Sequence, residues 1–260
     1  VPVCQKERNG NCLSTAQIQA ISNIFTGPVN AKGEALYATQ PYDPGLLGSN
    51  WASWKFESSV GTARDPVAVG IIFQVPPDLT VIQNSRQFAF NFNFDTDYPK
   101  LSAINDTYQE SAISFMLPPN ELNLDPLLYR GGKMLIVQGA ADGVFSVDDT
   151  QNWYDQLMQS YANNTSAKAS DFVRFFRVPG MNHSSAGLAT DQFDALHALV
   201  RWVEYGGKPE RIIATARGIG NLSGKINTEL PYDWAADRTR PLCAYPLIAR
   251  YKGQGDSEKA

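Results

Sequence analysis

The chain has 260 residues and a formal net charge of −4, and it is 43% hydrophobic and 18% charged. These values are ordinary for a globular protein, and this length can bury the core of one large or two small domains. No cluster of Lys and Arg residues stands out, so the sequence indicates no nucleic-acid partner. No apolar stretch approaches the roughly 20 residues needed to span a bilayer, so we expect no membrane partner.

The amino-terminal part combines one regular helix with a long irregular region. Ser14 and Gln17 have the spacing of a capping box, apolar residues follow at helical spacing, and Gly27 ends the pattern, so we expect a helix over 14–25. From there to about residue 117 the chain is rich in Gly, Pro, Asn and aromatic residues, unlike a regular βαβ layer. Within this region Phe alternates with Ala and Asn over 88–94, which predicts a strand.

From about residue 125 the pattern becomes one of alternating strands and helices. Short apolar runs predict strands over 134–138, 172–178 and 212–216. Amphipathic spacing predicts helices over 147–161 and 191–205. Strand, helix and strand in this order favour an α/β fold with a parallel sheet and crossover helices.

Three cysteines bear on the compartment. Cys4 and Cys12 flank a short polar segment, which favours a small disulfide-closed loop and therefore an oxidising environment. The alternative is a pair of free thiols. Cys243 is left over, either as a buried thiol or as a cysteine without its partner.

Two short loops carry the residues best suited to catalysis. Asp142 follows the strand predicted over 134–138, and His183 follows the strand predicted over 172–178. Because the carboxyl ends of parallel strands meet at one edge of a sheet, we expect these side chains to lie together. An acid followed by a histidine is the second half of a Ser-Asp-His triad in α/β-hydrolase order. The alternatives are a helix N-terminal acid for Asp142 and a surface imidazole for His183, and the other histidine, His197, is expected on a helix.

The nucleophile of such a triad is not found in the chain. No Gly-x-Ser-x-Gly sequence is present, and no serine combines a preceding strand with the flanking glycines of a nucleophile elbow. No complete EF-hand loop and no His-x-x-x-His pair occurs, so we predict no metal site of those kinds.

Aromatic residues are suited to line a ligand pocket, although such residues more often form a core. Trp51, Trp54 and Phe90 belong to the two aromatic clusters of the irregular region. Arg86 lies in the same neighbourhood and is suited to bind a carboxylate bidentately, the alternative being a solvent-exposed arginine.

The residues around both catalytic loops resemble the tannase/feruloyl esterase family. Gln138–Ser146 is similar to the acid loop of that family, and Val178–His183 is similar to its histidine loop. Further matches lie over 12–17, 24–28, 190–196, 201–204, 208–216, 240–246 and 249–253. The resemblance covers nearly the whole chain but only the carboxyl-terminal half of the family, which includes mono(2-hydroxyethyl) terephthalate hydrolases.

The resemblance implies an α/β-hydrolase core with a large inserted lid domain. Residues 1–122 would be the later part of the lid, and residues 123–260 the carboxyl-terminal part of the core. The nucleophilic serine, the oxyanion hole and a structural calcium ion of the lid would lie upstream of Val1, so the chain itself would hold no cofactor. Its partners would be a small aromatic ester and an amino-terminal segment or chain of the same precursor, in a secreted or periplasmic protein.

The implied activity is that of a serine-type carboxylic-ester hydrolase acting on feruloyl, galloyl or terephthalyl esters. Asp142 and His183 would be its triad acid and base, and Phe145, three residues after the acid, is expected to face the pocket. The residues that would bind substrate beside Phe145 are Arg86, Phe90, Trp51 and Trp54.

Two positions bear on whether such an enzyme would be active. Ser184 stands where the family usually has a cysteine bonded to one beside the nucleophile. Cys243 would pair with a cysteine beyond Ala260. The missing nucleophile and Ser184 favour the alternative function, a non-catalytic aromatic-ligand-binding pseudoenzyme or an inactive fragment.

Overall fold

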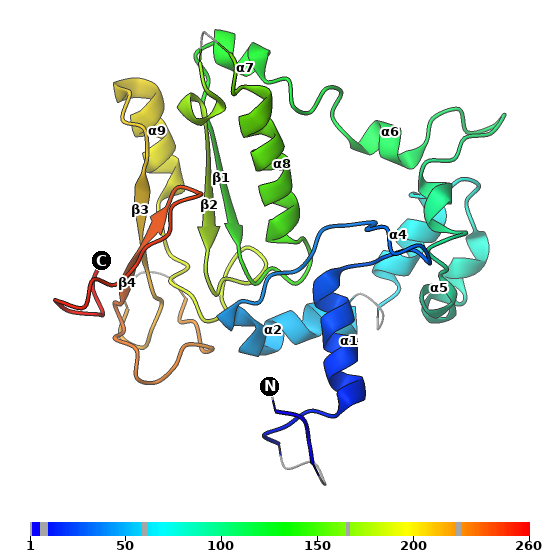
Figure 1. Ribbon diagram of the computed structural model, residues 1–260, viewed down its shortest axis with the longest axis horizontal. Helices are drawn as coiled ribbons and strands as arrows, with labels where there is room; N and C mark the ends of the chain where they lie inside the picture. Colours follow the sequence, from blue (N-terminus) through cyan, green and yellow to red (C-terminus); the bar gives the residue numbers. More distant parts are fainter. Residues whose placement is uncertain (1, 6–9, 59–61, 165–166, 222–224) are drawn as a thin grey trace.

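The computed structural model of the chain describes residues 2–5, 10–58, 62–164, 167–221 and 225–260 (Figure 1). The α-helices are α1 (Thr15–Thr26), α2 (Ser49–Ala52), α4 (Arg64–Ile71), α5 (Ser85–Asn91), α6 (Ala112–Met116), α7 (Asp125–Tyr129), α8 (Val147–Ser160) and α9 (Ala195–Tyr205). The strands are β1 (Met134–Gly139), β2 (Val173–Val178), β3 (Arg211–Thr215) and β4 (Thr239–Cys243). The 3-10 turns η1 (Pro44–Leu47), η3 (Leu79–Ile82), η4 (Tyr98–Leu101) and η5 (Ala169–Asp171) and the π-helical turn η2 (Ser53–Ser58) complete these elements.

Strands β1 and β2 form the parallel pair that the sequence predicts. Their register places Met134 opposite Val173 and Gly139 opposite Val178, and α8 makes the crossover between them. The third predicted strand also exists as β3, but its expected parallel arrangement is wrong. β3 pairs with β4 in the antiparallel sense, and β4 approaches β2 through an antiparallel bridge between Phe176 and Ala244. Among the described residues between β3 and β4 no helix is found.

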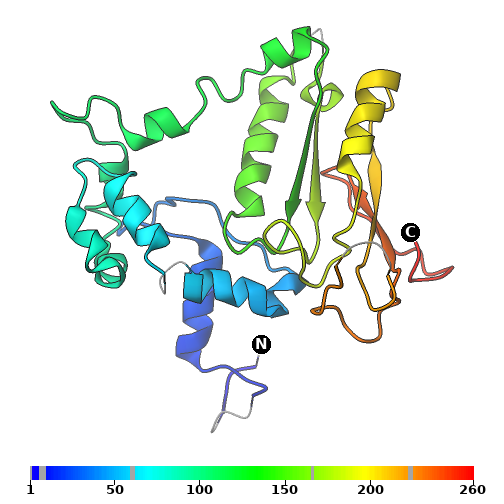
Figure 2. The same ribbon diagram turned by 180° about the vertical axis from the view of Figure 1, so that it is seen from behind.

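Side chains alternate between two cores on the two faces of the β1 and β2 pair, as period-two geometry requires. One face carries Ile136 and Phe175, packed against α8. The other face carries Val137 and Phe176, packed against α9 and the β3 and β4 pair. Both phenylalanines are fully buried. The two helices thus cover opposite faces of the strands (Figures 1 and 2), which is the layering of an α/β protein.

Helix α9 begins later than the predicted residue 191. Asp194 is its N-cap and accepts a hydrogen bond from the backbone N–H of His197, 2.8 Å away. The residues before it are engaged elsewhere, because the Asp191 carboxylate pairs with Arg217 and the Gln192 backbone bonds to Thr215. Because of these tertiary contacts, the helix begins at Ala195 and not at residue 191, where amphipathic spacing alone places its start.

The first predicted helix and the predicted disulfide are both confirmed. Ser14 and Gln17 form the reciprocal capping box of α1, and Gly27 is its C-cap. Cys4 and Cys12 are joined by a disulfide bond. Cys243 is a half-buried free thiol.

The strand predicted over 88–94 is wrong. Residues up to Asn91 belong to α5, and Phe88 contacts Phe92 with ring centroids 6.1 Å apart. Residues that recur every second position also recur every fourth, and i,i+4 neighbours meet on a helix. A side-chain bond between Gln87 and Asn91, again four apart, adds to the helical arrangement.

The carboxyl ends of β1 and β2 point toward α2, whereas α4, α5 and α6 lie well to one side of the strands (Figures 1 and 2). Loops that follow β1 and β2 therefore face α2 and the turn η2 after it. Among the described residues, no helix has the length and apolar character needed to cross a membrane.

Candidate active site

The loops that follow β1 and β2 are in direct backbone contact. The N–H of Ala141 donates to the carbonyl of Met181 at 3.0 Å, and the N–H of Ala140 donates to Val178 at 2.9 Å. Gly139 leaves room for this approach, because a Cβ there would lie 2.3 Å from the Met181 carbonyl oxygen. The glycine that ends the first strand thus lets the acid loop and the histidine loop meet.

Asp142 and His183 come together as the sequence predicts. Nδ1 of His183 lies 3.0 Å from Oδ2 and 3.2 Å from Oδ1 of Asp142. The Asp142 residue is 5% exposed, whereas the His183 side chain is 32% exposed. The acid is therefore enclosed, and the imidazole reaches from it toward solvent.

Two backbone donors hold the Asp142 carboxylate in place. Its Oδ1 accepts hydrogen bonds from the N–H of Val144 at 2.7 Å and of Phe145 at 3.1 Å. Because a carboxylate only accepts, the facing Nδ1 of His183 carries the proton in the neutral imidazole. Nε2 then has a free lone pair for a proton acceptor role, which is the role of the histidine in a catalytic triad.

The amino-terminal part of the chain supports the acid loop. The Ser146 N–H donates to the Tyr37 hydroxyl at 3.2 Å, and the Ser146 hydroxyl donates to the Thr39 carbonyl. Burial raises the pKa of Tyr37 above its ordinary value, with a contribution from nearby carboxylates that include Asp142. These contacts fix the acid loop against the segment that leads to η1.

Two of the predicted substrate-binding residues border His183. The ring of Trp54 meets the imidazole edge-on at a centroid distance of 5.3 Å, and the ring of Phe145 lies 5.7 Å away. Phe145 is 60% exposed, so its ring stands open beside the imidazole. Trp51 is instead a buried core residue, stacked on Phe25 at 5.9 Å. Two aromatic rings, those of Trp54 and Phe145, therefore contact the imidazole.

Two other predicted substrate-binding residues lie elsewhere. Arg86 and Phe90 are both on α5, where the guanidinium stacks over the Phe90 ring at 5.5 Å. Helix α5 lies apart from the carboxyl ends of the strands in both views (Figures 1 and 2), so the structure does not bring this pair to His183.

Sequence reasoning missed two cations near the site. Arg64 lies over the Trp54 ring at 5.1 Å while pairing with Asp65. Lys55 is half-buried; burial lowers its pKa below the ordinary value, and the charge of Asp142 opposes that effect. The proximity of Lys55 to Trp54 in the sequence was the available signal. Nothing in the linear pattern separates Arg64 from other arginines.

No group of three or more His, Cys, Asp and Glu side chains suited to hold a metal ion occurs among the residues that the structure describes. Asp142 and His183 form a pair whose partners are backbone donors and aromatic rings. The chemistry that this arrangement supports is proton transfer at Nε2 of the imidazole.

Comparisons with known proteins place the whole chain in one family. The profile of the family described as "Tannase and feruloyl esterase" matches residues 2–260. Mono(2-hydroxyethyl) terephthalate hydrolase of Piscinibacter sakaiensis is 35% identical over 97% of this chain and 42% of its own length. An uncharacterized esterase of Xanthomonas campestris is 28% identical over the whole chain and 47% of its own length. The chain thus spans less than half the length of these curated relatives.

Solved structures agree on the fold. Feruloyl esterase B from Aspergillus oryzae superposes with a TM-score of 0.59 at 21% identity, over 98% of this chain and 47% of that one. Tannin acyl hydrolase from Aspergillus niger superposes with a TM-score of 0.56 at 15% identity, over 94% of this chain and 42% of that one. These neighbours are α/β-hydrolases, which confirms the α/β-hydrolase fold class predicted from the sequence.

Proposed function

Because the chain belongs to the tannase and feruloyl esterase family, we propose that it carries the triad acid and histidine of a serine-type carboxylic-ester hydrolase. Its substrates are esters of aromatic acids, of the feruloyl, galloyl or terephthalyl type. The nucleophilic serine comes from sequence that precedes Val1, either in the same chain or in a second chain of the same precursor.

The observation that carries the proposal is the Asp142 and His183 pair, held 3.0 Å apart at the edge where β1 and β2 end. In the reaction, Nε2 of His183 accepts the proton of the serine hydroxyl as the serine oxygen bonds to the ester carbonyl carbon. The imidazolium then returns that proton to the leaving alcohol, and the same cycle with water releases the acid. Asp142 orients the ring and stabilises the imidazolium that forms twice.

The aromatic surroundings of His183 support an aromatic acyl group. The rings of Trp54 and Phe145 both lie next to the imidazole, at centroid distances of 5.3 and 5.7 Å. An aromatic acyl ring bound beside His183 would gain ring contacts with Trp54 or Phe145 that an acetyl group does not make. In this proposal residues 1–122 are the later part of a lid and residues 123–260 are the carboxyl-terminal part of the hydrolase core.

The free edge of β1 supports a missing part of the sheet. β1 pairs with β2 on one side, and no strand among the described residues pairs with its other edge. Residues of this strand such as Leu135 and Val137 are apolar but only half-buried. The unpaired backbone edge of β1 is a template for another strand, so we assign it to the segment that brings the serine.

Three further assignments complete the proposal. The disulfide between Cys4 and Cys12 supports a secreted or periplasmic location, because such bonds persist in oxidising compartments. The calcium ion that the family resemblance implies belongs to the same preceding sequence. The half-buried thiol of Cys243 is available to a cysteine beyond Ala260.

The test uses the longer product, meaning this chain expressed together with the sequence encoded before Val1. We expect it to hydrolyse a chromogenic feruloyl or galloyl ester, and His183→Ala to reduce kcat by on the order of 10⁴-fold or more. His197→Ala is the matched control, because His197 is exposed on α9 and should leave kcat unchanged. Hydrolysis that survives His183→Ala would refute the assignment.

A second outcome favours the alternative function. Ser184 is exposed, has φ 67° and cannot form the disulfide that the resemblance places there. If the longer product binds aromatic esters in a calorimeter but does not turn them over, the chain is part of a non-catalytic binding protein.

A further inference from the structure

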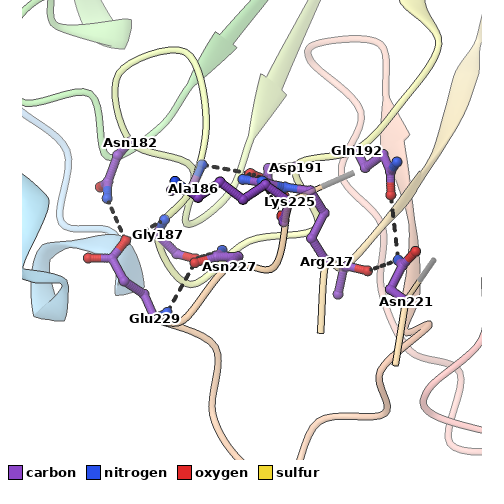
Figure 3. A network of polar contacts seen from close by, with 11 residues as sticks. Asn182, Ala186, Gly187, Asp191, Gln192, Arg217, Asn221, Lys225, Asn227 and Glu229 are labelled. Carbon is purple, nitrogen blue, oxygen red and sulfur yellow. Dashed lines mark hydrogen bonds and ion pairs between the residues drawn. The ribbon is translucent and has the colours of Figure 1, made fainter. Parts of the chain in front are cut away.

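The carboxylate of Glu229 joins two segments that are far apart in the sequence. On one side its Oε2 accepts hydrogen bonds from the Asn182 amide at 3.3 Å and from the Gly187 N–H at 2.7 Å (Figure 3). On the other side its Oε1 accepts from the Ser49 hydroxyl at 3.3 Å and the Asn50 N–H at 3.4 Å. The first pair lies in the segment between β2 and α9 that contains His183, which is called the histidine loop from here on, and the second pair belongs to α2.

Glu229 is itself held by contacts within the segment that follows β3. The N–H of Glu229 donates to the Asn227 side chain at 3.1 Å, and the Asn227 amide donates to the Gly187 carbonyl at 2.8 Å. The Asn227 N–H bonds to the carbonyl of Arg217 at 2.8 Å, and the Arg217 guanidinium donates to the Lys225 carbonyl at 2.5 Å (Figure 3). Glu229 therefore lies on a segment that several hydrogen bonds hold in place.

The histidine loop depends on such external partners. Directly after His183, Ser184 and Ala186 have φ 67° and 64°, which are left-handed conformations that non-glycine residues seldom adopt. The Ala186 N–H donates to the Asp191 carboxylate at 2.6 Å, and the next N–H, of Gly187, donates to Glu229. Two carboxylates thus accept hydrogen bonds from consecutive N–H groups of this loop. Left-handed non-glycine residues persist where the surrounding structure holds them in place.

Glu229 differs from Asp191 in what it connects. The Asp191 side chain is fully enclosed, and its carboxylate bonds to the Ala186 N–H and to Arg217, neither of which belongs to α2. Glu229 also reaches Ser49 and Asn50 at the start of α2, and the turn that follows α2 carries Trp54, whose ring contacts His183. The Glu229 carboxylate therefore connects the histidine loop with the segment that carries Trp54.

We propose that Glu229 is a positioning residue for His183: it holds the histidine loop against α2, so that the imidazole keeps its geometry toward Asp142 and Trp54. The inference rests on the proposed function for its catalytic meaning. A carboxylate is required because all four contacts need an acceptor. A glutamine side chain has one acceptor oxygen, and its NH₂ group would face one pair of donors.

The first test reads the imidazole directly in this chain, uniformly labelled with ¹⁵N. The chain has two histidines. Long-range ¹H–¹⁵N spectra recorded at high pH show which ring nitrogen of His183 carries the proton, and the exposed His197 serves as an internal reference. We expect His183 in one tautomer with the proton on Nδ1, and a mixture of tautomers in Glu229→Gln. A wild-type tautomer in the folded Glu229→Gln variant would overturn the proposal.

A matched control separates positioning from general loss of a carboxylate. Glu258 accepts the Ala235 N–H at 3.0 Å and pairs with Arg238 at 3.0 Å, so Glu258→Gln removes a comparable acceptor away from the histidine loop. It should leave the His183 signals unchanged. Where Glu229→Gln does not fold, Glu229→Asp replaces it. The aspartate keeps the charge but is one methylene too short to bond to the histidine loop and to α2 at the same time. A single His183 tautomer in the Glu229→Asp variant would then overturn the proposal.

The second test measures kinetics in the longer product. We expect Glu229→Gln to lower kcat by on the order of 100-fold with KM changed less than about 3-fold, because a misplaced base slows chemistry more than binding. A raised KM with unchanged kcat would overturn the proposal. If the unmodified longer product hydrolyses no ester, the proposed function fails, whereas the tautomer measurement still decides the role of Glu229.

Discussion

Replacement of Asp142 by Asn is the sharpest perturbation of the candidate site. The side chain accepts backbone N–H groups of Val144 and Phe145 at Oδ1 and faces Nδ1 of His183 with Oδ2. In Asp142→Asn the amide oxygen can keep both backbone donors, which places the NH₂ group against Nδ1. An NH₂ group donates, so Nδ1 must accept, and the ring proton moves to Nε2. The base then has no lone pair for the serine proton.

We expect this change to lower kcat by on the order of 10⁴-fold, which corresponds to about 5 kcal/mol of transition-state stabilisation. Folding should change little, because shape and backbone bonds are preserved at Asp142. The assay is hydrolysis of a chromogenic aromatic ester by the longer product, with urea unfolding as the control for stability. In ¹⁵N spectra the variant should show the His183 proton on Nε2. Turnover within about ten-fold of the unmodified protein, or an unchanged tautomer, would refute the reasoning.

Three more predictions follow from single contacts. Trp54→Ala should raise KM for an aromatic-acid ester up to about ten-fold, because a ring contact contributes on the order of 1 kcal/mol. The acetyl ester of the same alcohol serves as the control, and equal effects on both esters would contradict a role of Trp54 in binding the acyl group. Reducing the disulfide between Cys4 and Cys12, which are eight residues apart, should lower the free energy of unfolding by about 2.5 kcal/mol in urea titrations with and without reductant, and superimposable curves would argue against it. Burial raises the pKa of Asp43 above its ordinary value, so its ionisation costs stability increasingly as the pH rises through that raised pKa. Asp43→Asn should therefore gain more stability, relative to the unmodified chain, at pH 7 than at pH 4 in denaturant unfolding, and an equal gain at both values would show that its charge is not the cause.

Local sequence was sufficient to predict several elements of the fold, including the two strands that position Asp142 and His183. Apolar runs of five to seven residues predicted β1 and β2, and the capping box predicted α1, because hydrogen bonds and side-chain periodicity within a short segment decide these structures. The pairing of Asp142 with His183 followed from one topological rule, that parallel strands end at the same edge. The Cys4 and Cys12 bond followed from proximity in the chain.

The wrong predictions share a physical origin in contacts that lie outside the segment. Residues 88–94 have a pattern compatible with both strand and helix, and without a neighbouring strand the helical i,i+4 contacts prevail. The predicted direction of β3 failed because its pairing partner, β4, arrives from the carboxyl-terminal side. Helix α9 starts late because Asp191 is taken by Arg217.

Short segments of the sequence were enough to predict β1 and β2 and to place Asp142 and His183 at their ends, since each of these depends on residues near one another in the chain. Only the folded chain shows that the rings of Trp54 and Phe145 contact the His183 imidazole while Arg86 lies elsewhere. It also shows that Glu229, 46 residues after His183, accepts hydrogen bonds from the histidine loop and from α2. Such contacts depend on the path of loops through space, and no periodicity in the sequence encodes that path.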